Sequence, residues 1–241
     1  MQNLNLHSLS FNFQDMKFTY YGHACFLIET GGKKFLFDPF ITGNELAAGI
    51  VDAAKIEADY IFVSHGHGDH VADLVPIAMR TGATVIGAYE VVDWAMKNGA
   101  PKGHHMNFGP ARFEFGKLHY TPAQHSSGLP DGSYGGNPGG FLFHDTEKKF
   151  YYSGDTCLTM DMQLIPMYAK PDFAILPIGG NFTMDADDAL IASDFIKCNK
   201  IIGVHFDTFG YIKIDHEAAK EKFRTAGKEL ILPVIGETIE L

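Results

Sequence analysis

Three histidines and one aspartate fall within six consecutive residues of this 241-residue chain, in the sequence His65-Gly-His67-Gly-Asp69-His70. Imidazole and carboxylate groups are the usual ligands of divalent transition metals. In an extended backbone His65 and His67 project to the same side, and the two glycines allow a tight fold that turns Asp69 and His70 toward a neighbouring point. The motif therefore predicts one metal ion held by two histidines and a second, close by, held by aspartate and histidine.

Metal-capable side chains also stand at the ends of other apolar segments. The motif directly follows the apolar run 60–63, and His125, Asp155 and His205 each come at or just beyond a later segment with the character of a buried strand. In open α/β sheets, sites assemble at the carboxyl ends of the strands. Four strand ends with the same ligand chemistry predict one shared site.

The remaining pattern alternates strand-like and helix-like segments, which indicates a sheet flanked by helices. No Pro/Ser-rich linker divides the chain, so we expect a single domain over residues 1–241, with 1–16 as an extension or an extra edge strand. The stretch 41–58 mixes loop and helix, and the polar segment around His104-His105 has the character of a loop. Expected strands are 18–21, 25–29, 34–37, 60–64, 84–87, 112–120 with a turn at 116–117, 140–144, 149–153, 173–177, 200–204 and 231–235; expected helices are 72–81, 90–98, one from 183 onward, and 215–226.

Residues 126–140 contain six glycines and two prolines, too many for a regular element. A loop of about fifteen residues inside a compact domain is usually functional or disordered. Because this one begins directly after His125, we expect an active-site lid, with a plain surface loop as the alternative.

Composition excludes several classes of protein. The formal net charge is −10 and no basic run occurs, which argues against general nucleic-acid binding and against an anionic-membrane surface. No apolar stretch is long enough to cross a membrane, and the N-terminus lacks the features of a secretory signal. The three cysteines predict no disulfide framework. We therefore expect a cytoplasmic protein; its oligomeric state is not indicated.

The ordered set of the motif at 65–70, then His125, Gly154-Asp155-Thr156 and His205 resembles the metallo-β-lactamase superfamily of metal-dependent hydrolases. The further phrases Gly22-His23-Ala24, Phe37-Asp38-Pro39-Phe40, 177–185 and 205–208 resemble a bacterial and archaeal branch known simply as metal-dependent hydrolases. That branch is similar to ascorbate-6-phosphate lactonases and, more distantly, to N-acyl-phosphatidylethanolamine phospholipase D and tRNA 3′-processing endonucleases.

The resemblance implies a fold and a division of the ligands. The fold would be an αββα sandwich, with two mixed sheets flanked by helices and the site at one edge. The first metal would bind His65, His67 and His125. The second would bind Asp69, His70 and His205, with Asp155 bridging the two.

Such a centre would supply a hydroxide at neutral pH, because zinc lowers the pKa of bound water from 15.7 to about 7. Asp69 or Asp155 would orient that hydroxide and accept its proton. With two carboxylates, five neutral histidines and a bridging hydroxide, two divalent ions leave a local charge of about +1, which suits an anionic small-molecule substrate. Zinc is the expected metal, although Mn²⁺, Fe²⁺, Co²⁺ or Ni²⁺ would fit similar ligands. In the superfamily, His67 in place of glutamate disfavours a redox di-iron role.

Other residues carry weaker signals. His23 approaches the metals or donates a proton, or else it is an ordinary core histidine. Asp38 either hydrogen-bonds a ligand histidine or caps a turn. Asn181 and Asp207 are candidates to line the pocket.

Two further positions have structural interpretations. Cys157 either tunes the site or is a packing residue. Thr183 is expected to cap a helix whose first turn carries Asp185, Asp187 and Asp188, an arrangement that complements the helix dipole.

The function that this sequence favours is a dinuclear metal-dependent hydrolase that uses a metal-bound hydroxide to attack a small ester, lactone or phosphoester. One alternative is a phosphodiesterase acting on RNA or phospholipid, which would need a basic or apolar docking surface. The other is a non-catalytic metal-binding protein on the same fold, since ligands alone show only that metal can bind.

Overall fold

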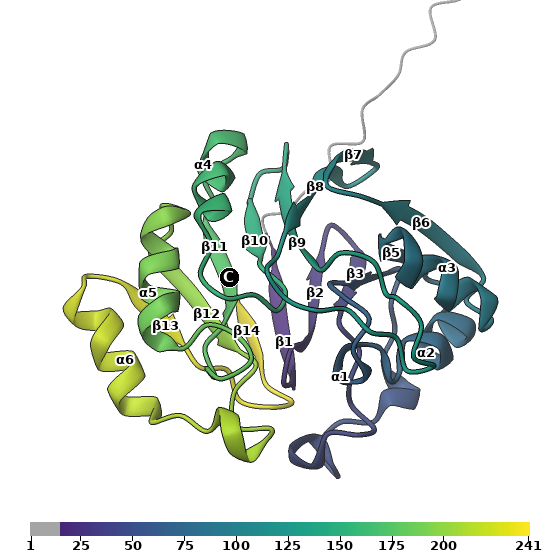
Figure 1. The fold of residues 1–241 in the computed structure, drawn as a ribbon, viewed down its shortest axis with the longest axis horizontal. Helices are drawn as coiled ribbons and strands as arrows, with labels where there is room; N and C mark the ends of the chain where they lie inside the picture. The colour runs from purple at the N-terminus through teal and green to yellow at the C-terminus, as the bar shows by residue number, and fades with distance from the viewer. Residues whose placement is uncertain (1–14) are drawn as a thin grey trace, which may run out of the picture.

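A computed structural model describes residues 15–241, so most of the expected extension or edge strand at 1–16 lies outside the described residues. Two sheets face each other at the centre, and helices lie on their outer sides (Figure 1). This is the expected αββα sandwich with two mixed sheets. No helix in residues 15–241 combines the length and the apolar character needed to span a membrane.

Each sheet has seven strands. The first runs in the order β14 (Thr238–Glu240), β1 (Lys17–Gly22), β2 (Cys25–Thr30), β3 (Lys33–Phe37), β4 (Tyr60–Val63), β5 (Thr84–Ala88) and β6 (Lys102–Met106). The second runs in the order β13 (Glu229–Ile231), β12 (Lys200–Val204), β11 (Phe173–Pro177), β10 (Phe150–Tyr152), β9 (Gly139–His144), β8 (Gly116–Pro122) and β7 (Gly109–Phe113).

The outer layers are helical. Short helix α1 (Gly68–Val71), α2 (Leu74–Thr81) and α3 (Tyr89–Lys97) belong to the side of the first sheet, while α4 (Ile165–Tyr168), α5 (Ala186–Phe195) and α6 (His216–Thr225) cover the second (Figure 1). Single 3₁₀ turns complete the set: η1 (Glu45–Ala47), η2 (Ala53–Lys55), η3 (Met160–Leu164) and η4 (Gly210–Ile212).

Alternation along the strands of the second sheet creates two apolar layers, because successive side chains point to opposite faces. In β9, Phe141 and Phe143 join the core between the sheets, while Leu142 packs under the helices. In β10, Tyr152 points to the inner core and Tyr151 to the outer layer. The inner core is rich in phenylalanine, and this packing holds the two sheets face to face.

Parallel pairing brings the site-bearing strand ends together. Strand β3 pairs with β4 in parallel, with Phe37 opposite Phe62, so Asp38 and the segment from Ser64 leave the sheet side by side. In the second sheet β10, β11 and β12 are also parallel neighbours. Asp155 and His205 follow two of these strands, so both sheets deliver ligands to one edge.

Several expected boundaries differ from the structure. The helix expected over 72–81 is α2, which begins at Leu74, and the separate short helix α1 precedes it. The hairpin turn expected at 116–117 lies at residues 114–115, because Gly116 already begins β8. His104-His105 belongs to β6 rather than to a loop, because it pairs with β5. Asp185, not Thr183, caps α5: its side chain accepts hydrogen bonds from the backbone N–H groups of residues 187 and 188. Strand β14 and the turns at 160–168 were not anticipated from the sequence.

Candidate metal centre

All seven predicted ligands converge at the edge of the sandwich. Their nitrogen and oxygen atoms form three overlapping groups, and within each group the ligand atoms lie within 4.8 Å of one another. The groups are His65/His67/His125, His65/His70/Asp155 and His23/Asp69/His70/His205. The first is the set expected for one metal. The third contains the set expected for the other and adds His23.

Asp155 lies between the two sets. Its Oδ2 atom is 3.0 Å from His205 Nε2, 3.3 Å from His70 Nε2 and 3.7 Å from His125 Nε2. These three histidines come from both predicted sets. The carboxylate therefore has the position that a bridging ligand needs.

The motif folds into the start of a short helix. His67 caps the short helix α1, and its Nδ1 atom lies 2.9 Å from His65 Nε2, so both rings aim at one point. Asp69 and His70 follow within α1, where consecutive side chains diverge by about 100°. His70 is therefore buried against Asp155, while the Asp69 side chain is 28% exposed and faces the cavity.

A buried hydrogen-bond relay orients two of the histidines. Asp38 Oδ2 lies 2.9 Å from His70 Nδ1 and accepts hydrogen bonds from the hydroxyls of Ser64 and Tyr152, both at 2.6 Å. Since the Ser64 hydroxyl donates to Asp38, it accepts from His65 Nδ1, 2.9 Å away. Protons on both Nδ1 atoms leave both Nε2 lone pairs free for a metal.

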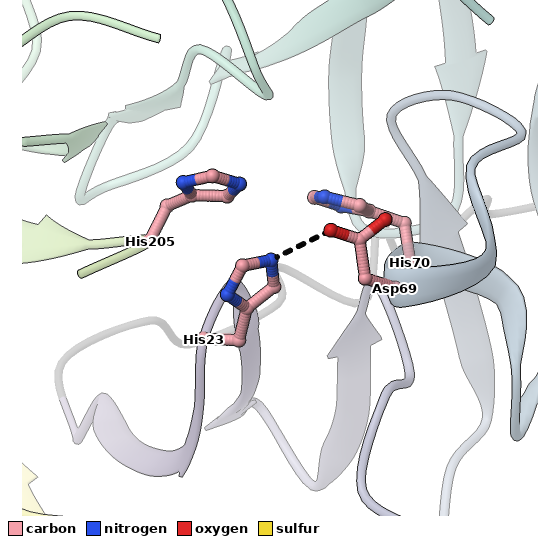
Figure 2. Close-up of side chains that lie close together, drawn as sticks. All are labelled: His23, Asp69, His70 and His205. Carbon is pink, nitrogen blue, oxygen red and sulfur yellow. Dashed lines mark hydrogen bonds and ion pairs between the residues drawn. The ribbon is translucent and has the colours of Figure 1, made fainter. Parts of the chain in front are cut away.

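His23 is held against the second set. Its Nε2 atom lies 3.1 Å from Asp69 Oδ2 (Figure 2), and its Nδ1 atom lies 3.0 Å from Thr208 Oγ1. The Thr208 hydroxyl donates to the carbonyl oxygen of Phe206, so it accepts from His23 Nδ1–H. In the neutral ring, Nε2 is then an acceptor that faces a carboxylate oxygen. Two acceptors at this separation need a proton or a metal ion between or beside them.

Unpartnered buried atoms show that a metal fits here. Within the described part of the chain, His70 Nε2 and Asp155 Oδ1 are buried and make no hydrogen bond. Buried polar atoms are almost always satisfied, so exceptions at one point indicate a missing partner. Nitrogen and oxygen donors in this number suit a divalent transition metal.

Charge supports the same conclusion. Burial lowers the pKa of His65 well below its ordinary value, with His70 adding to the effect, and burial also lowers the pKa of His67 and His125. Neutral imidazoles are the form that binds metal. For His70, burial opposes the charged form, but Asp155 and Asp38 outweigh it and raise the pKa well above the ordinary range. A metal would therefore displace a proton from His70.

A cavity of about 530 Å³ opens onto these ligands. Its walls include Asp69, Asp155 and three of the ligand histidines. The remaining lining residues are Ser126, which belongs to the expected lid segment, and Phe182, Phe209 and Tyr211, none of which was predicted to line the site from the sequence. The abundance of aromatic residues in this chain suggested core packing, and no local signal separates these three rings from the buried ones.

Two predicted pocket positions, Asn181 and Asp207, do not line the cavity, and neither does Cys157, which was expected to tune the site or to pack. Asn181 is exposed beside Phe182, and Cys157 is exposed as a free thiol. Asp207 instead pairs with His216, at 2.6 Å, and accepts from the backbone N–H of Ile214. Both Asn181 and Asp207 have positive φ angles, 57° and 63°, so they shape the loops that carry cavity residues.

The segment 126–140 packs beside the site rather than over it. Ser126 is the residue of this segment that lines the cavity. Ser127 Oγ accepts from the N–H of Gly66, and Asp131 accepts from the Trp94 indole N–H at 3.1 Å. These contacts tie the segment to the metal-binding loop and to α3, which favours the surface-loop alternative over a lid.

Comparisons with known proteins agree with the geometry. Residues 17–205 match the family model of the β-lactamase superfamily domain. This chain belongs to that superfamily. Within it, the chain is 55% identical to a UPF0173 metal-dependent hydrolase of Flavobacterium johnsoniae over 94% of this chain and all of the relative, and 53% identical to one of Christiangramia forsetii with the same coverage.

Among solved structures of the superfamily fold, Igni18, a metallo hydrolase from the archaeon Ignicoccus hospitalis, superposes with a TM-score of 0.84. It is 32% identical, and the match covers 94% of this chain and 98% of that one. The protein described here is therefore a metal-dependent hydrolase of the β-lactamase superfamily. The names of these relatives do not specify a substrate.

Proposed function

We propose that this protein hydrolyses a small ester, lactone or phosphoester at a centre that holds two divalent metal ions, with zinc as the first candidate. The observation that carries the proposal is the position of Asp155, whose Oδ2 atom lies within 3.7 Å of histidines from both ligand groups. A carboxylate shared in this way joins two sites into one centre.

The residues divide the work of binding. His65, His67 and His125 would hold one ion, and Asp69, His70 and His205 would hold the other. Bound divalent ions supply a water molecule acidified to near-neutral pKa and polarise the oxygen of the electrophile. The Asp38–Ser64 relay fixes the orientation of the His65 and His70 rings, so that their Nε2 atoms would be available to the ions.

Asp69 would accept the proton of the attacking water: both aspartates line the cavity, but the Asp69 side chain is 28% exposed and that of Asp155 only 3%. A proton on Asp69 Oδ2 would then be donated to His23 Nε2, 3.1 Å behind it. Burial, together with the nearby His205, lowers the pKa of His23 to about 4, so at neutral pH the ring is an uncharged acceptor for that hydrogen bond. No serine or cysteine nucleophile is needed.

A substrate panel tests the proposal. Metal-loaded wild-type protein would be assayed against small acyl esters, lactones and phosphoesters, with the His67→Ala variant as the blank and metal content measured in both. Hydrolysis of at least one class by the wild type, reduced to the blank level in the variant, is the expected result. If the metal-loaded wild type hydrolyses no member of the panel above the blank, the proposal is wrong.

A further inference from the structure

Three aromatic side chains form one wall of the cavity over the metal ligands. Phe182 lies on the loop between β11 and α5, Phe209 caps η4, and Tyr211 lies within η4. We call these three residues the aromatic wall. They come from two separate loops, so their common position at the cavity is a product of the fold and not of sequence proximity.

The rings are oriented toward the site and toward one another. The centroids of Phe182 and Tyr211 are 6.4 Å apart with the rings at 81°, an edge-to-face arrangement. Phe209 packs edge-on against His23, with centroids 5.2 Å apart. The aromatic wall therefore begins beside His23, which contacts Asp69, and extends outward along the cavity.

The aromatic wall is largely open to solvent. The exposed fractions are 49% for Phe182, 37% for Phe209 and 80% for Tyr211. Exposing apolar rings to water costs free energy, and clustered exposed rings beside a concave site mark a binding surface. A ligand group that covered the wall would recover this free energy.

Two loop residues with positive φ hold the wall in place. Asn181, φ 57°, turns the chain just before Phe182. The backbone N–H of Asp207 donates to the carbonyl of Ile212 at 2.8 Å, which closes the loop that carries Phe209 and Tyr211. These backbone features fix the two loops that carry the aromatic wall.

The cavity offers no fixed cation to a substrate. Its lining contains no lysine or arginine among residues 15–241; apart from the metal ligands, Ser126 and the Tyr211 hydroxyl are the polar groups. Recognition of a second anionic group on a substrate normally uses Arg or Lys. A neutral group is the better match to this wall.

We infer that the substrate carries a neutral, apolar group the size of an aromatic ring next to the bond that is cleaved, and that this group sits on the aromatic wall. The inference rests on the proposed function and narrows it to carboxylic esters or lactones that bear no second anionic group. The cavity volume of about 530 Å³ falls within the range of small-molecule sites and accommodates a single-ring ester.

Benzyl acetate and methyl acetate test the inference, because they share the acyl group and differ in the ring. For the wild type, KM should be at least about ten-fold lower for benzyl acetate. Phe182→Ala and Tyr211→Ala should each raise KM for benzyl acetate by about five-fold or more while leaving methyl acetate within about two-fold. Tyr89→Ala, which removes an exposed ring from α3 outside the cavity, should change neither value.

A charged analogue provides the second arm. In 4-(acetoxymethyl)benzoate the ring is kept and a carboxylate is added, so KM should rise above that of benzyl acetate. Equal KM values for benzyl and methyl acetate, or tighter binding of the charged analogue, would overturn the inference.

A binding measurement separates this inference from the proposed function. 4-Phenyl-2-butanone is the ketone in which a CH₂ replaces the ester oxygen of benzyl acetate, so it binds without being hydrolysed. It should bind the wild type and His67→Ala, and bind Tyr211→Ala several-fold more weakly. If the wild type hydrolyses no ester, lactone or phosphoester but the ketone binds in this pattern, the proposed function fails and the aromatic wall remains a binding site. If the ketone binds Tyr211→Ala as well as it binds the wild type, the inference is wrong even if esters are hydrolysed.

Discussion

The Nδ1 atom of His70 lies 2.9 Å from Oδ2 of Asp38, and neither side chain is exposed to solvent. The Asp38 side chain also accepts hydrogen bonds from the Ser64 backbone N–H and from two hydroxyls, so each of its side-chain hydrogen bonds uses a carboxylate oxygen as acceptor. This buried carboxylate links the strand end after β3 to the metal-binding loop after β4.

Asp38→Asn should weaken metal binding by about 10- to 100-fold, because an amide places N–H groups against donors and no longer holds the proton on His70 Nδ1. Competition with a chromophoric chelator measures the affinity. Asp73→Asn is the matched control: Asp73 is also a buried carboxylate, but it accepts from the backbone N–H groups of Ile41 and Thr42 instead. An unchanged affinity in Asp38→Asn would contradict the orienting role.

His23→Phe should lower the hydrolysis rate by about 10²-fold or more at saturating metal, since the phenyl ring fills the space but cannot accept a proton shared with Asp69. Thr208→Val removes the partner of His23 Nδ1 and should cause a smaller loss. Metal content is measured in both variants. A His23→Phe enzyme with wild-type rate would assign this residue to packing alone.

Gly154 allows β10 to turn so that Asp155 enters the site. Its φ is +62°, and an added Cβ would lie 2.6 Å from the Gly139 carbonyl oxygen and 2.8 Å from the Ser64 Cβ. Gly154→Ala should therefore lower the free energy of unfolding by about 3 kcal/mol or more and weaken metal binding. Gly82→Ala is the control, because Gly82 has a similar φ of +71° with no atom near the added Cβ.

Urea unfolding compares these two variants. Gly82→Ala carries only the cost of the left-handed backbone, about 1 kcal/mol. If both variants lose the same free energy of unfolding, the close contacts of the added Cβ at position 154 do not contribute to the loss.

A buried imidazole pair away from the metal centre should make stability depend on pH. His119 Nδ1 lies 2.8 Å from His144 Nε2. Burial lowers the pKa of both rings, with Lys117 adding to the effect at His119 and His119 itself adding to it at His144. Below the unfolded value of about 6.5, the unfolded state then binds more protons than the folded state. The pair's contribution to stability is therefore fully present above pH 6.5 and decreases as pH falls through the lowered folded pKa values.

Free energies of unfolding of chelator-treated protein between pH 7.5 and 5.5 check this prediction, since carboxylates stay ionised over that range. His144→Gln removes one of the two rings and should lose less stability than the wild type over the same interval. If the two proteins lose the same amount, the imidazole pair does not control the pH dependence.

The metal ligands could be predicted from the sequence because they lie at or shortly after the ends of apolar strands. The carboxyl ends of such strands meet at one edge of a sheet, which gives the position of the ligands. The features that could not be predicted depend on tertiary contacts. Strand β6 forms from polar residues because β5 offers it a pairing edge, and β14 pairs with β1 from the opposite end of the chain.

The same limit applies within the site. His23, Asp38 and His205 all have positive φ, which only the surrounding structure imposes on non-glycine residues. The part that Ser64 and Tyr152 play in the relay, and the aromatic wall, likewise depend on residues far apart in the sequence.

A two-metal hydrolytic centre requires two metal ions per chain, and this number can be measured. Elemental analysis of wild-type protein and of His67→Ala, with ester hydrolysis assayed on the same samples, is the measurement. We predict about two ions per chain in the wild type and fewer in His67→Ala. Hydrolysis should be lost together with the ion that the variant fails to bind. No more than one ion in saturated wild-type protein, or undiminished hydrolysis by His67→Ala, would contradict the account.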